Sequence, residues 1–380
     1  MRNKNEDAFF ALVRVGLFPI HGEGGMINDS LFENVDWEKV YKIAREQSII
    51  GLVEAGIEWF KVNDPRFSIP RKCALQFIGK TMQLKQRNES MNVFISSLIE
   101  KMRDADIYTL LVKGQSVAQC YEEPLWRACG DVDLFLNGDN YEKAKKFLVP
   151  LASKVEMEYE GTKHLGMIIN GWVVELHGNL RVGLPSRINR VLDDIQTETF
   201  NGGNVSSWMN GRTQIFTLGK ENDIVYVFVH FFNHFYKEGI GLRQISDWCR
   251  LLWTYRDDLD VSKIENCIKE MGLTSEWKAF GAYAVEYLGM PADALPMYDS
   301  SSKWVRKAHL INEFIMNVGN MGHNRDMSHF SKYPYLVRKC VSMGRRVGDL
   351  INHARIFPLD SLWFFPRIML NGVRSAIIGE

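Results

Sequence analysis

The stretch IYTLLVKGQS at residues 107–116, followed by GDVDLFL at residues 130–136, determines the architecture of this 380-residue chain. Each segment contains a short run of apolar and β-branched residues, which is typical of a buried strand. The first run ends at Lys113 and Gly114, where the chain is expected to turn. We therefore predict two successive strands, the first of which ends in a glycine turn.

Asp131 and Asp133 alternate with apolar residues in the second segment. Residues two apart in a strand point to the same face, so both carboxylates are expected to project side by side while Val132 and Leu134 enter the core. Two carboxylates that close raise each other's pKa unless a cation lies between them. Oxygen ligands of this kind suit Mg²⁺ or Mn²⁺, which bridges to substrate phosphates.

A third acid, Glu175, lies in the segment WVVELH at residues 172–177. Apolar strand residues flank it, and we expect this segment to form a neighbouring strand whose face completes the acid cluster. Three acids around two cations suit a mechanism in which one ion lowers the pKa of an attacking hydroxyl. The second ion then stabilises the triphosphate and its pyrophosphate leaving group.

Helical and strand-like patterns follow one another in three regions. Apolar residues recur at helical spacing from Val35 to about Ala105, strand-like runs follow, and helical spacing returns after a turn-rich stretch at 201–211. The predicted fold class is α+β. We expect a mixed-sheet core with helices on it at 105–215, flanked by a helical N-terminal region at 1–104 and a helical C-terminal region at 216–380.

Single elements follow from the same periodicities. Asp36 and Asn92 are candidate helix starts, and Pro65 and Pro70 mark a break between helices. Beyond the two strands above, strands are predicted at 154–159, 164–169 and 173–176, the last two joined by a turn at 170–171. Helices are predicted at 115–121, 141–148, 222–236, 242–255, 261–271 and 275–288.

Charge and cysteine content limit the classes of function. Lys and Arg together number 46, as do Asp and Glu, so the chain has no net positive charge with which to hold a polynucleotide. Six cysteines without a CxxC pair fit reduced thiols better than disulfides or a zinc site. We expect no signal peptide, because Glu6, Asp7 and Arg14 interrupt the apolar run near the start, and we expect no membrane-spanning helix. We expect a cytoplasmic protein with no transmembrane segment, and the balance of charge favours a substrate other than a polynucleotide.

The order of these motifs resembles a known enzyme signature. A strand that ends in a glycine turn, then Asp-x-Asp in the next strand, then a later lone acid is similar to the polymerase-β-like nucleotidyltransferase superfamily. More narrowly, Val112-Lys113-Gly114, Arg127 and Asp131-Val132-Asp133-Leu134 resemble the family of uncharacterised nucleotidyltransferases. The turn departs from the superfamily, which usually has Gly-Ser or Gly-Gly there, but the narrower family shares Lys-Gly. Further similar segments lie near Trp37, at His164, at 174–177 and at 230–247.

The resemblance implies a nucleotidyltransferase core that binds a nucleoside triphosphate and Mg²⁺ or Mn²⁺. Lys113 could contact a phosphate as a point charge, and Arg127 is a second candidate for the same contact. The remaining site residues that the resemblance implies are Gly114, Gln115 and Ser116 at the triphosphate, Asp131 and Asp133 on both metals, and Glu175 on the catalytic metal.

Four histidines each have two interpretations. His164 and His177 are expected on adjacent strands near Glu175, where they could orient a ligand or simply hydrogen-bond within the strand pair. His230 and His234 share a helix face, but the Glu of an HExxH zinc motif is absent. We therefore expect His230 and His234 to pack against the sheet.

Two basic features are also ambiguous. Arg243 and Asp247 lie four apart on one predicted helix, which favours a surface ion pair, although the resemblance makes a substrate-facing role for Arg243 possible. From Lys332 onward, basic residues alternate with aromatic ones. This segment fits a solvated face over a buried aromatic stripe, or else a surface for a membrane or an anion.

These features favour an enzyme that transfers a nucleoside monophosphate from a nucleoside triphosphate to a small-molecule or protein acceptor, with release of pyrophosphate. Two alternatives stay open. One is a nucleotide-binding or interaction module that has lost turnover, against which the presence of all three acids argues. The other is a phosphotransferase that uses the same carboxylates to move the γ-phosphoryl group.

Overall fold

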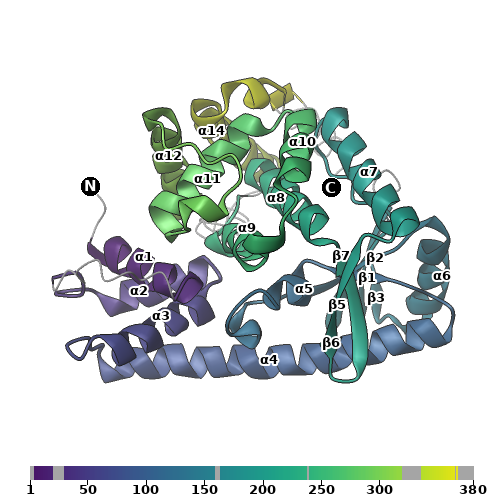
Figure 1. Cartoon of the computed structure of the whole chain (residues 1–380), viewed down its shortest axis with the longest axis horizontal. Helices are drawn as coiled ribbons and strands as arrows, with labels where there is room; N and C mark the ends of the chain where they lie inside the picture. Colours follow the sequence, from purple (N-terminus) through teal and green to yellow (C-terminus); the bar gives the residue numbers. More distant parts are fainter. Residues whose placement is uncertain are drawn as a thin grey trace.

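The computed structural model describes residues 4–19, 30–158, 163–237, 239–318, 335–363 and 365–366. These residues form an α+β fold in which helices surround a mixed five-stranded sheet, as the sequence predicts. Figure 1 shows the sheet at one side of the molecule and the N-terminal helices at the other. In this part of the chain, no helix combines the length and the apolar character needed to cross a membrane.

Four helices form the N-terminal part of the described chain. The Asp36 carboxylate accepts a hydrogen bond from the backbone N–H of Lys39 at 3.3 Å and caps the second helix. The predicted break at Pro65 and Pro70 is confirmed, because it separates the third helix from the fourth. The helix start predicted at Asn92 is wrong, since the fourth helix continues through it. The helices are α1 (Lys4–Leu17), α2 (Trp37–Glu46), α3 (Ile50–Asn63) and α4 (Arg71–Asp104).

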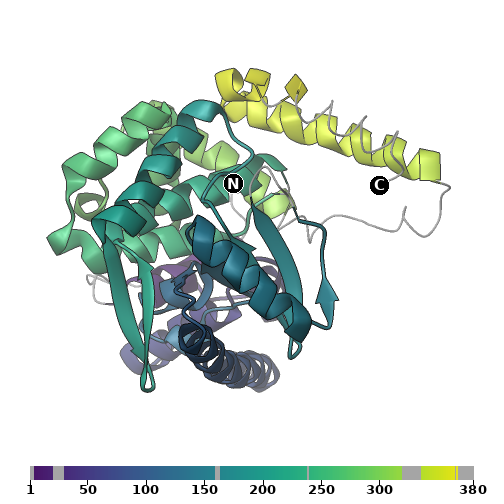
Figure 2. The same ribbon diagram turned by 90° about the vertical axis from the view of Figure 1, so that its right-hand side faces the viewer.

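Helix α4 has 34 residues and is therefore about 50 Å long. Its first half contributes Phe77 to a core that it shares with α2 and α3. Its second half contributes Met91, Ile95 and Ile99 to a core beneath the sheet. Burial continues at helical spacing on both sides of Asn92, and no proline interrupts it, so the helix does not end there. Figure 1 shows α4 extending from the N-terminal helices to the sheet, and Figure 2 views it end-on.

The five-stranded sheet has the order β1-β2-β5-β4-β3, with β2 and β5 parallel and the other neighbours antiparallel. The turn predicted between β4 and β5 is confirmed, with positive φ at Asn170 and Gly171. The third strand stops at Val155, short of the prediction, and Tyr159 lies outside the described residues. The strands are β1 (Leu110–Val112), β2 (Asp131–Phe135), β3 (Lys154–Val155), β4 (His164–Ile169) and β5 (Trp172–His177).

One face of the sheet is apolar and covered, and the other carries the acids. Val132, Leu134, Val174 and Leu176 are each at most 1% exposed and belong to the core that α4 and α6 share with the sheet. The predicted division of β2 into a core face and an acidic face is thus confirmed for its apolar residues. The short helices of this part are α5 (Gly114–Ala118), η1 (Pro124–Trp126), α6 (Gly138–Leu148) and η2 (Val149–Leu151).

The prediction of a turn-rich stretch at 201–211 is wrong, because most of it forms a strand. Helix α7 (Ser186–Gly202) ends at Gly203, whose φ of 68° is a left-handed cap. The hairpin of β6 (Val205–Asn210) and β7 (Thr213–Leu218) follows. Residues of β6 alternate between exposed and half-buried, and the strand contains Asn and Ser rather than a run of apolar residues. A two-stranded ribbon open to solvent on one face therefore lacks the apolar signal on which the prediction relied.

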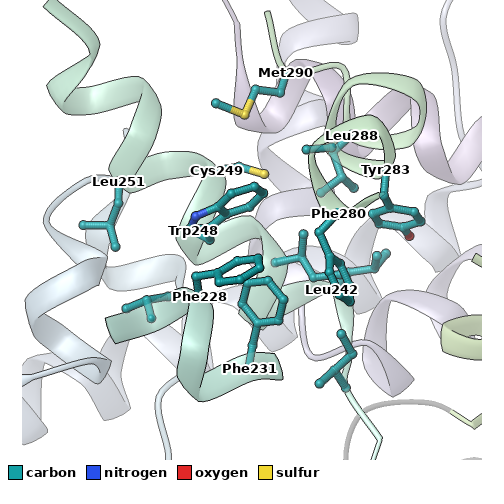
Figure 3. Packing of buried hydrophobic residues seen from close by; sticks show 14 of the residues in the cluster. Phe228, Phe231, Leu242, Trp248, Cys249, Leu251, Phe280, Tyr283, Leu288 and Met290 are labelled. Carbon is teal, nitrogen blue, oxygen red and sulfur yellow. The ribbon is translucent and has the colours of Figure 1, made fainter. Parts of the chain in front are cut away.

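The C-terminal helices pack around aromatic rings, shown in Figure 3. Phe228 and Trp248 each lie 4.8 Å from Trp277, measured between ring centroids. Four helices are confirmed close to their predicted bounds, because their apolar spacing matches burial on one helix face. The helices are α8 (Lys220–Lys237), α9 (Leu242–Tyr255), α10 (Val261–Met271), α11 (Thr274–Leu288), α12 (Ser302–Val318) and α14 (Tyr335–Ile356), with η3 (Arg256–Asp258) and η4 (Ala292–Ala294) between them.

Helix α9 is tied to the loop before β2 by a buried ion pair. Arg127 Nε and Nη2 donate to the two carboxylate oxygens of Asp247 at 2.7 and 2.6 Å, and both side chains are at most 7% exposed. The Tyr121 hydroxyl donates to the same carboxylate at 2.8 Å. Asn88 of α4 fixes the same loop, because its Nδ2 donates to the backbone oxygens of Leu125 and Arg127, both at 2.8 Å. These bonds set the position of α9 over the sheet.

We expect Asp247→Ala to lower the free energy of unfolding by about 3–5 kcal/mol, because it leaves the Arg127 guanidinium buried without its counter-charge. Urea denaturation measures this. The control is Asp257→Ala, whose side chain is 85% exposed in a surface pair with Arg256 and should change the value by less than about 0.5 kcal/mol. Similar effects of the two substitutions would contradict a structural role for the buried pair.

Glu54 of α3 is a buried acid of a different kind. It is 2% exposed, and neither carboxylate oxygen has a hydrogen-bond partner among the described residues. Burial raises the pKa of Glu54 from 4.5 to about 7, with the nearby Lys61 opposing the rise. The folded chain therefore keeps a proton that the unfolded chain loses between about pH 4.5 and 7.

Because the folded state binds the extra proton, the contribution of Glu54 to stability is full below pH 4.5, falls as the pH rises to about 7, and is then constant. We expect Glu54→Gln to remove a decline of up to about 3 kcal/mol across this range. Urea denaturation at several pH values measures it, with the exposed Glu89→Gln as control. The same pH slope in Glu54→Gln as in the wild type would contradict the assignment.

Candidate active site on the open face of the sheet

Three acids project from two neighbouring strands into one cavity. Asp131 and Asp133 belong to β2, and the parallel register places Glu175 of β5 beside Asp133. Residues paired across neighbouring strands point to the same face of a sheet. A cavity of about 170 Å³ is lined by all three acids, and side chains of α8 and α9 form its opposite wall. The acidic face therefore meets open space where the apolar face meets packed helices.

Asp131 has the electrostatic environment of a cation ligand. The negative charge of Asp133 raises the pKa of Asp131, burial raises it further, and Lys113 opposes the rise. A divalent cation between the two carboxylates would remove this repulsion. The three acids supply oxygen ligands, which suit Mg²⁺ or Mn²⁺, so this donor set fits the ions expected from the sequence.

Lys113 lies at the turn after β1 and faces the acids. Its φ of 55° with ψ of −150° is a conformation that residues other than glycine rarely adopt. Strained backbone of this kind is concentrated at functional sites. Lys113 Nζ forms an ion pair with Asp133 Oδ1 at 2.7 Å. Burial alone would lower the pKa of Lys113, but Asp133 and the other nearby acids raise it above its usual value, so the ammonium stays charged. Gly114 follows with a φ of 44°.

The structure does not bring the side chains of Gln115 and Ser116 into this cavity. Gln115 is 1% exposed, and its Nε2 lies 3.8 Å from the sulfur of Met91 in α4. Ser116 is buried in the first turn of α5, where its backbone N–H donates to Lys113 O at 2.9 Å. Of the expected triphosphate-binding turn, Lys113 and Gly114 line the cavity.

The two arginines differ from the expectation. Arg127 lines the cavity, but its Nε and Nη2 donate to Asp247 and its Nη1 donates to Ala128 O at 3.1 Å. Its contact with a phosphate stays a prediction. The surface ion pair expected between Arg243 and Asp247 is wrong, because Asp247 is buried and pairs with Arg127 instead. Arg243 lines the cavity, donates through Nη1 to Ala128 O at 3.1 Å, and has an Nε without a hydrogen-bond partner among the described residues.

His164 and His177 contact the acid cluster directly. His164 Nε2 lies 3.1 Å from Glu175 Oε2, and His177 Nε2 lies 2.8 Å from Asp133 Oδ1 and 3.5 Å from Glu175 Oε2. Burial opposes ionisation of Glu175, but the hydrogen bonds from the two histidines hold its pKa below the usual range. Burial opposes the charge of His177, but its hydrogen bonds to Asp133 and Glu175 raise its pKa. Both interpretations of these histidines remain compatible with this geometry.

Two other histidines, both from α8, line the cavity. They are His230 and His234, with ring centroids 4.6 Å apart. Burial lowers the pKa of His230 well below its usual value, and the positive charge of Lys113 adds to the effect, so this imidazole is neutral. Their spacing of four residues indicated a shared helix face, but only the packing of α8 over the acids shows that this face borders the cavity.

Five cysteines lie among the residues whose side chains the structure describes, and none of these five forms a disulfide. Cys73, Cys120, Cys129 and Cys249 are buried, Cys267 is half-buried, and all five are free thiols. Cys129 lines the cavity, and burial raises the pKa of its thiol, which keeps the thiol protonated.

Comparison with known families agrees with this geometry. A profile of the family described as uncharacterised nucleotidyltransferase matches residues 33–289, a span that contains the sheet, the three acids and helices α8 and α9. No curated protein and no solved structure was found to match the chain. The family match covers more than half of the sequence and supports nucleotidyl transfer as the general activity. The chain belongs to the family of uncharacterised nucleotidyltransferases.

Proposed function

We propose that this protein transfers a nucleoside monophosphate from a nucleoside triphosphate to a hydroxyl, carboxyl or phosphate group of a small molecule or protein, with release of pyrophosphate. The observation that carries the proposal is the convergence of Asp131, Asp133 and Glu175 on one cavity. Membership of a nucleotidyltransferase family supports the reaction class. Equal numbers of basic and acidic residues favour an acceptor other than a polynucleotide.

In this proposal Asp131 and Asp133 hold two divalent cations, Mg²⁺ or Mn²⁺, and Glu175 holds the catalytic one. Such cations supply a more acidic attacking hydroxyl and neutralise charge on the phosphoryl oxygens. The carboxylates fix the position at which this chemistry takes place. The sheet contributes rigidity, because β2 and β5 are central strands whose apolar faces are fully packed.

Lys113 and Arg243 are the cationic side chains that we propose for the triphosphate. Lys113 pairs with Asp133 in the structure, and a cation at Asp133 would release its ammonium toward a phosphate oxygen. Arg243 is held at one nitrogen by Ala128 O, and its Nε has no hydrogen-bond partner among the described residues. A guanidinium with a donor to spare at the wall of an acidic cavity suits an anionic ligand that arrives with cations.

We expect Asp131→Asn, and separately Asp133→Asn, to reduce nucleotidyl transfer by at least about 100-fold, because each removes a ligand for the charge-neutralising cations. The assay uses α-³²P-labelled nucleoside triphosphates, Mg²⁺ and a cell extract as the source of acceptor. The matched control is Asp139→Asn, an exposed acid at the start of α6, which should transfer as the wild type does. Thermal unfolding checks that each variant is folded.

The products separate the alternatives. Appearance of α-label in an acceptor together with pyrophosphate supports nucleotidyl transfer. Transfer of γ-label with release of a nucleoside diphosphate would instead identify a phosphotransferase. Binding of nucleotide without any transfer under these conditions would identify an inactive binding module, and transfer that survives in Asp131→Asn and Asp133→Asn would contradict the assigned site.

We expect Lys113→Met to have opposite effects on the two ligands. Binding of Mn²⁺ without nucleotide should tighten, because the ammonium no longer competes for Asp133. The KM for the nucleoside triphosphate should rise by about tenfold, because one phosphate contact is lost and about 1.4 kcal/mol of binding free energy corresponds to a tenfold change in affinity. Isothermal titration with Mn²⁺ and steady-state kinetics measure the two effects. Weaker Mn²⁺ binding in this variant would contradict the role assigned to Lys113.

A further inference from the structure

A second set of ligand atoms lies at the edge of the acid cluster. It consists of His164 Nε2 from β4 with Glu175 Oε2 and His177 Nε2 from β5. The two imidazole nitrogens lie 3.1 and 3.5 Å from the same carboxylate oxygen. One ligand atom from each of the three residues lies within 4.8 Å of the other two, and all three residues are half-buried. Asp131 and Asp133 are not part of this set.

The register of β4 and β5 brings the three residues together. His164 is paired with His177 across the antiparallel ladder, so their side chains lie on the same face, with ring centroids 4.9 Å apart. Glu175 precedes His177 by two residues and shares that face. Opposite Glu175 the partner strand has Gly166. The side chain of Glu156 occupies the space that a Cβ of Gly166 would take. His164 reaches Glu175 diagonally across the ladder, with His164 Nε2 3.1 Å from Glu175 Oε2.

The spacing of these atoms fits coordination of a metal ion. Metal–nitrogen and metal–oxygen bonds of about 2.0–2.2 Å place neighbouring ligands roughly 3.0–3.6 Å apart in tetrahedral or octahedral geometry. The two separations from Glu175 Oε2 lie in this range. Two imidazoles and one carboxylate are ligands for Zn²⁺, Co²⁺, Mn²⁺ or Fe²⁺, whereas Mg²⁺ prefers oxygen ligands alone. Three protein ligands also leave positions open for water or a substrate oxygen.

A metal bound to His177 Nε2 would replace the hydrogen bond between this atom and Asp133. The structure can tolerate the loss of this hydrogen bond. Asp133 retains the ion pair with Lys113 at 2.7 Å, so its charge stays compensated. The competing interpretation is that both histidines only donate hydrogen bonds that orient the carboxylates of the acid cluster. The two interpretations differ in whether the imidazole nitrogens bind a metal, which can be measured directly.

We propose that His164, His177 and Glu175 bind one first-row transition-metal cation at a site separate from the Mg²⁺ position between Asp131 and Asp133. The site goes beyond the proposed nucleotidyl transfer and stands without it, because the metal binds in the absence of nucleotide. Glu175 belongs to both sites. A transition-metal cation held by the two imidazoles therefore shares a ligand with the cations that serve the triphosphate, and couples the occupancy of the two sites.

Co²⁺ is the probe for this site, because its visible absorption reports nitrogen ligands. We expect one Co²⁺ per chain at micromolar concentrations, not displaced by millimolar Mg²⁺, and imidazole ligands in the X-ray absorption spectrum of the wild-type complex. His164→Gln and His177→Gln should each weaken binding by more than about 100-fold, because loss of a direct ligand exceeds the 10- to 100-fold effect of an outer-shell change. Thermal unfolding verifies that both variants are folded.

Two control variants locate the metal. Asp131→Asn should bind Co²⁺ as the wild type does, since Asp131 belongs only to the carboxylate site. His234→Gln should also bind it normally, and this variant tests the imidazole pair that lines the cavity, His230 and His234. Loss of Co²⁺ binding in either control, with binding retained in His164→Gln and His177→Gln, would place the metal elsewhere and overturn the proposal.

The wild-type protein alone can also overturn it. Failure to bind stoichiometric Co²⁺, ready displacement by Mg²⁺, or an X-ray absorption spectrum without imidazole ligands would leave the histidines as hydrogen-bond donors only. The transfer assay is independent of these measurements. Co²⁺ binding without nucleotidyl transfer would refute the proposed function alone, and transfer without Co²⁺ binding to the imidazoles would refute the metal site alone.

Discussion

Repulsion between carboxylates on adjacent strands is the constraint around which this structure is arranged. The parallel pairing of β2 with β5 places Asp133 beside Glu175, and strand alternation adds Asp131 to the same face. Such a cluster is costly to bury unless other groups compensate its charge. Lys113 forms an ion pair with Asp133. His177 forms a hydrogen bond with Asp133, and His164 forms one with Glu175. The strained backbone at Lys113 is the geometric cost of placing that ammonium within reach.

The surrounding helices keep space open above the acids. Helices α8 and α9 cover the acidic face without filling it, and the position of α9 is set by the buried pair of Arg127 and Asp247. Taking both charges out of water offsets much of their attraction, so the value of the pair lies more in orientation than in stability. Each partner has a defined geometry because the two hydrogen bonds are parallel. A salt bridge thus shapes the site without taking part in its chemistry.

The periodicity of the sequence predicted those features that depend on neighbouring residues alone. Alternation in β2 predicted the core face of the strand, and apolar spacing predicted the helices from α8 to α11, because in each case burial follows the period of the element itself. Contacts between distant segments left no such signal. Arg127 and Asp247 are 120 residues apart, and their pairing changed the interpretation of both arginines. The side chain of Gln115 turns into the core for a similar reason, since the position of α4 beneath α5 determines where it packs. The β6–β7 hairpin escaped prediction because its partly polar strands lack a continuous apolar run.

Helix α4 has a consequence for how the molecule comes apart. Its Phe77 is packed among the N-terminal helices, and its Met91, Ile95 and Ile99 form the floor of the sheet. Unfolding of the N-terminal helices would remove the packing of the first turns of α4. Loss of α4 would in turn expose the apolar faces of β2 and β5 to water. We therefore expect the two cores to unfold together as one cooperative unit, with the amide protons along α4 among the last to exchange with solvent. A metal or nucleotide that binds at the sheet would consequently protect the distant N-terminal helices as well.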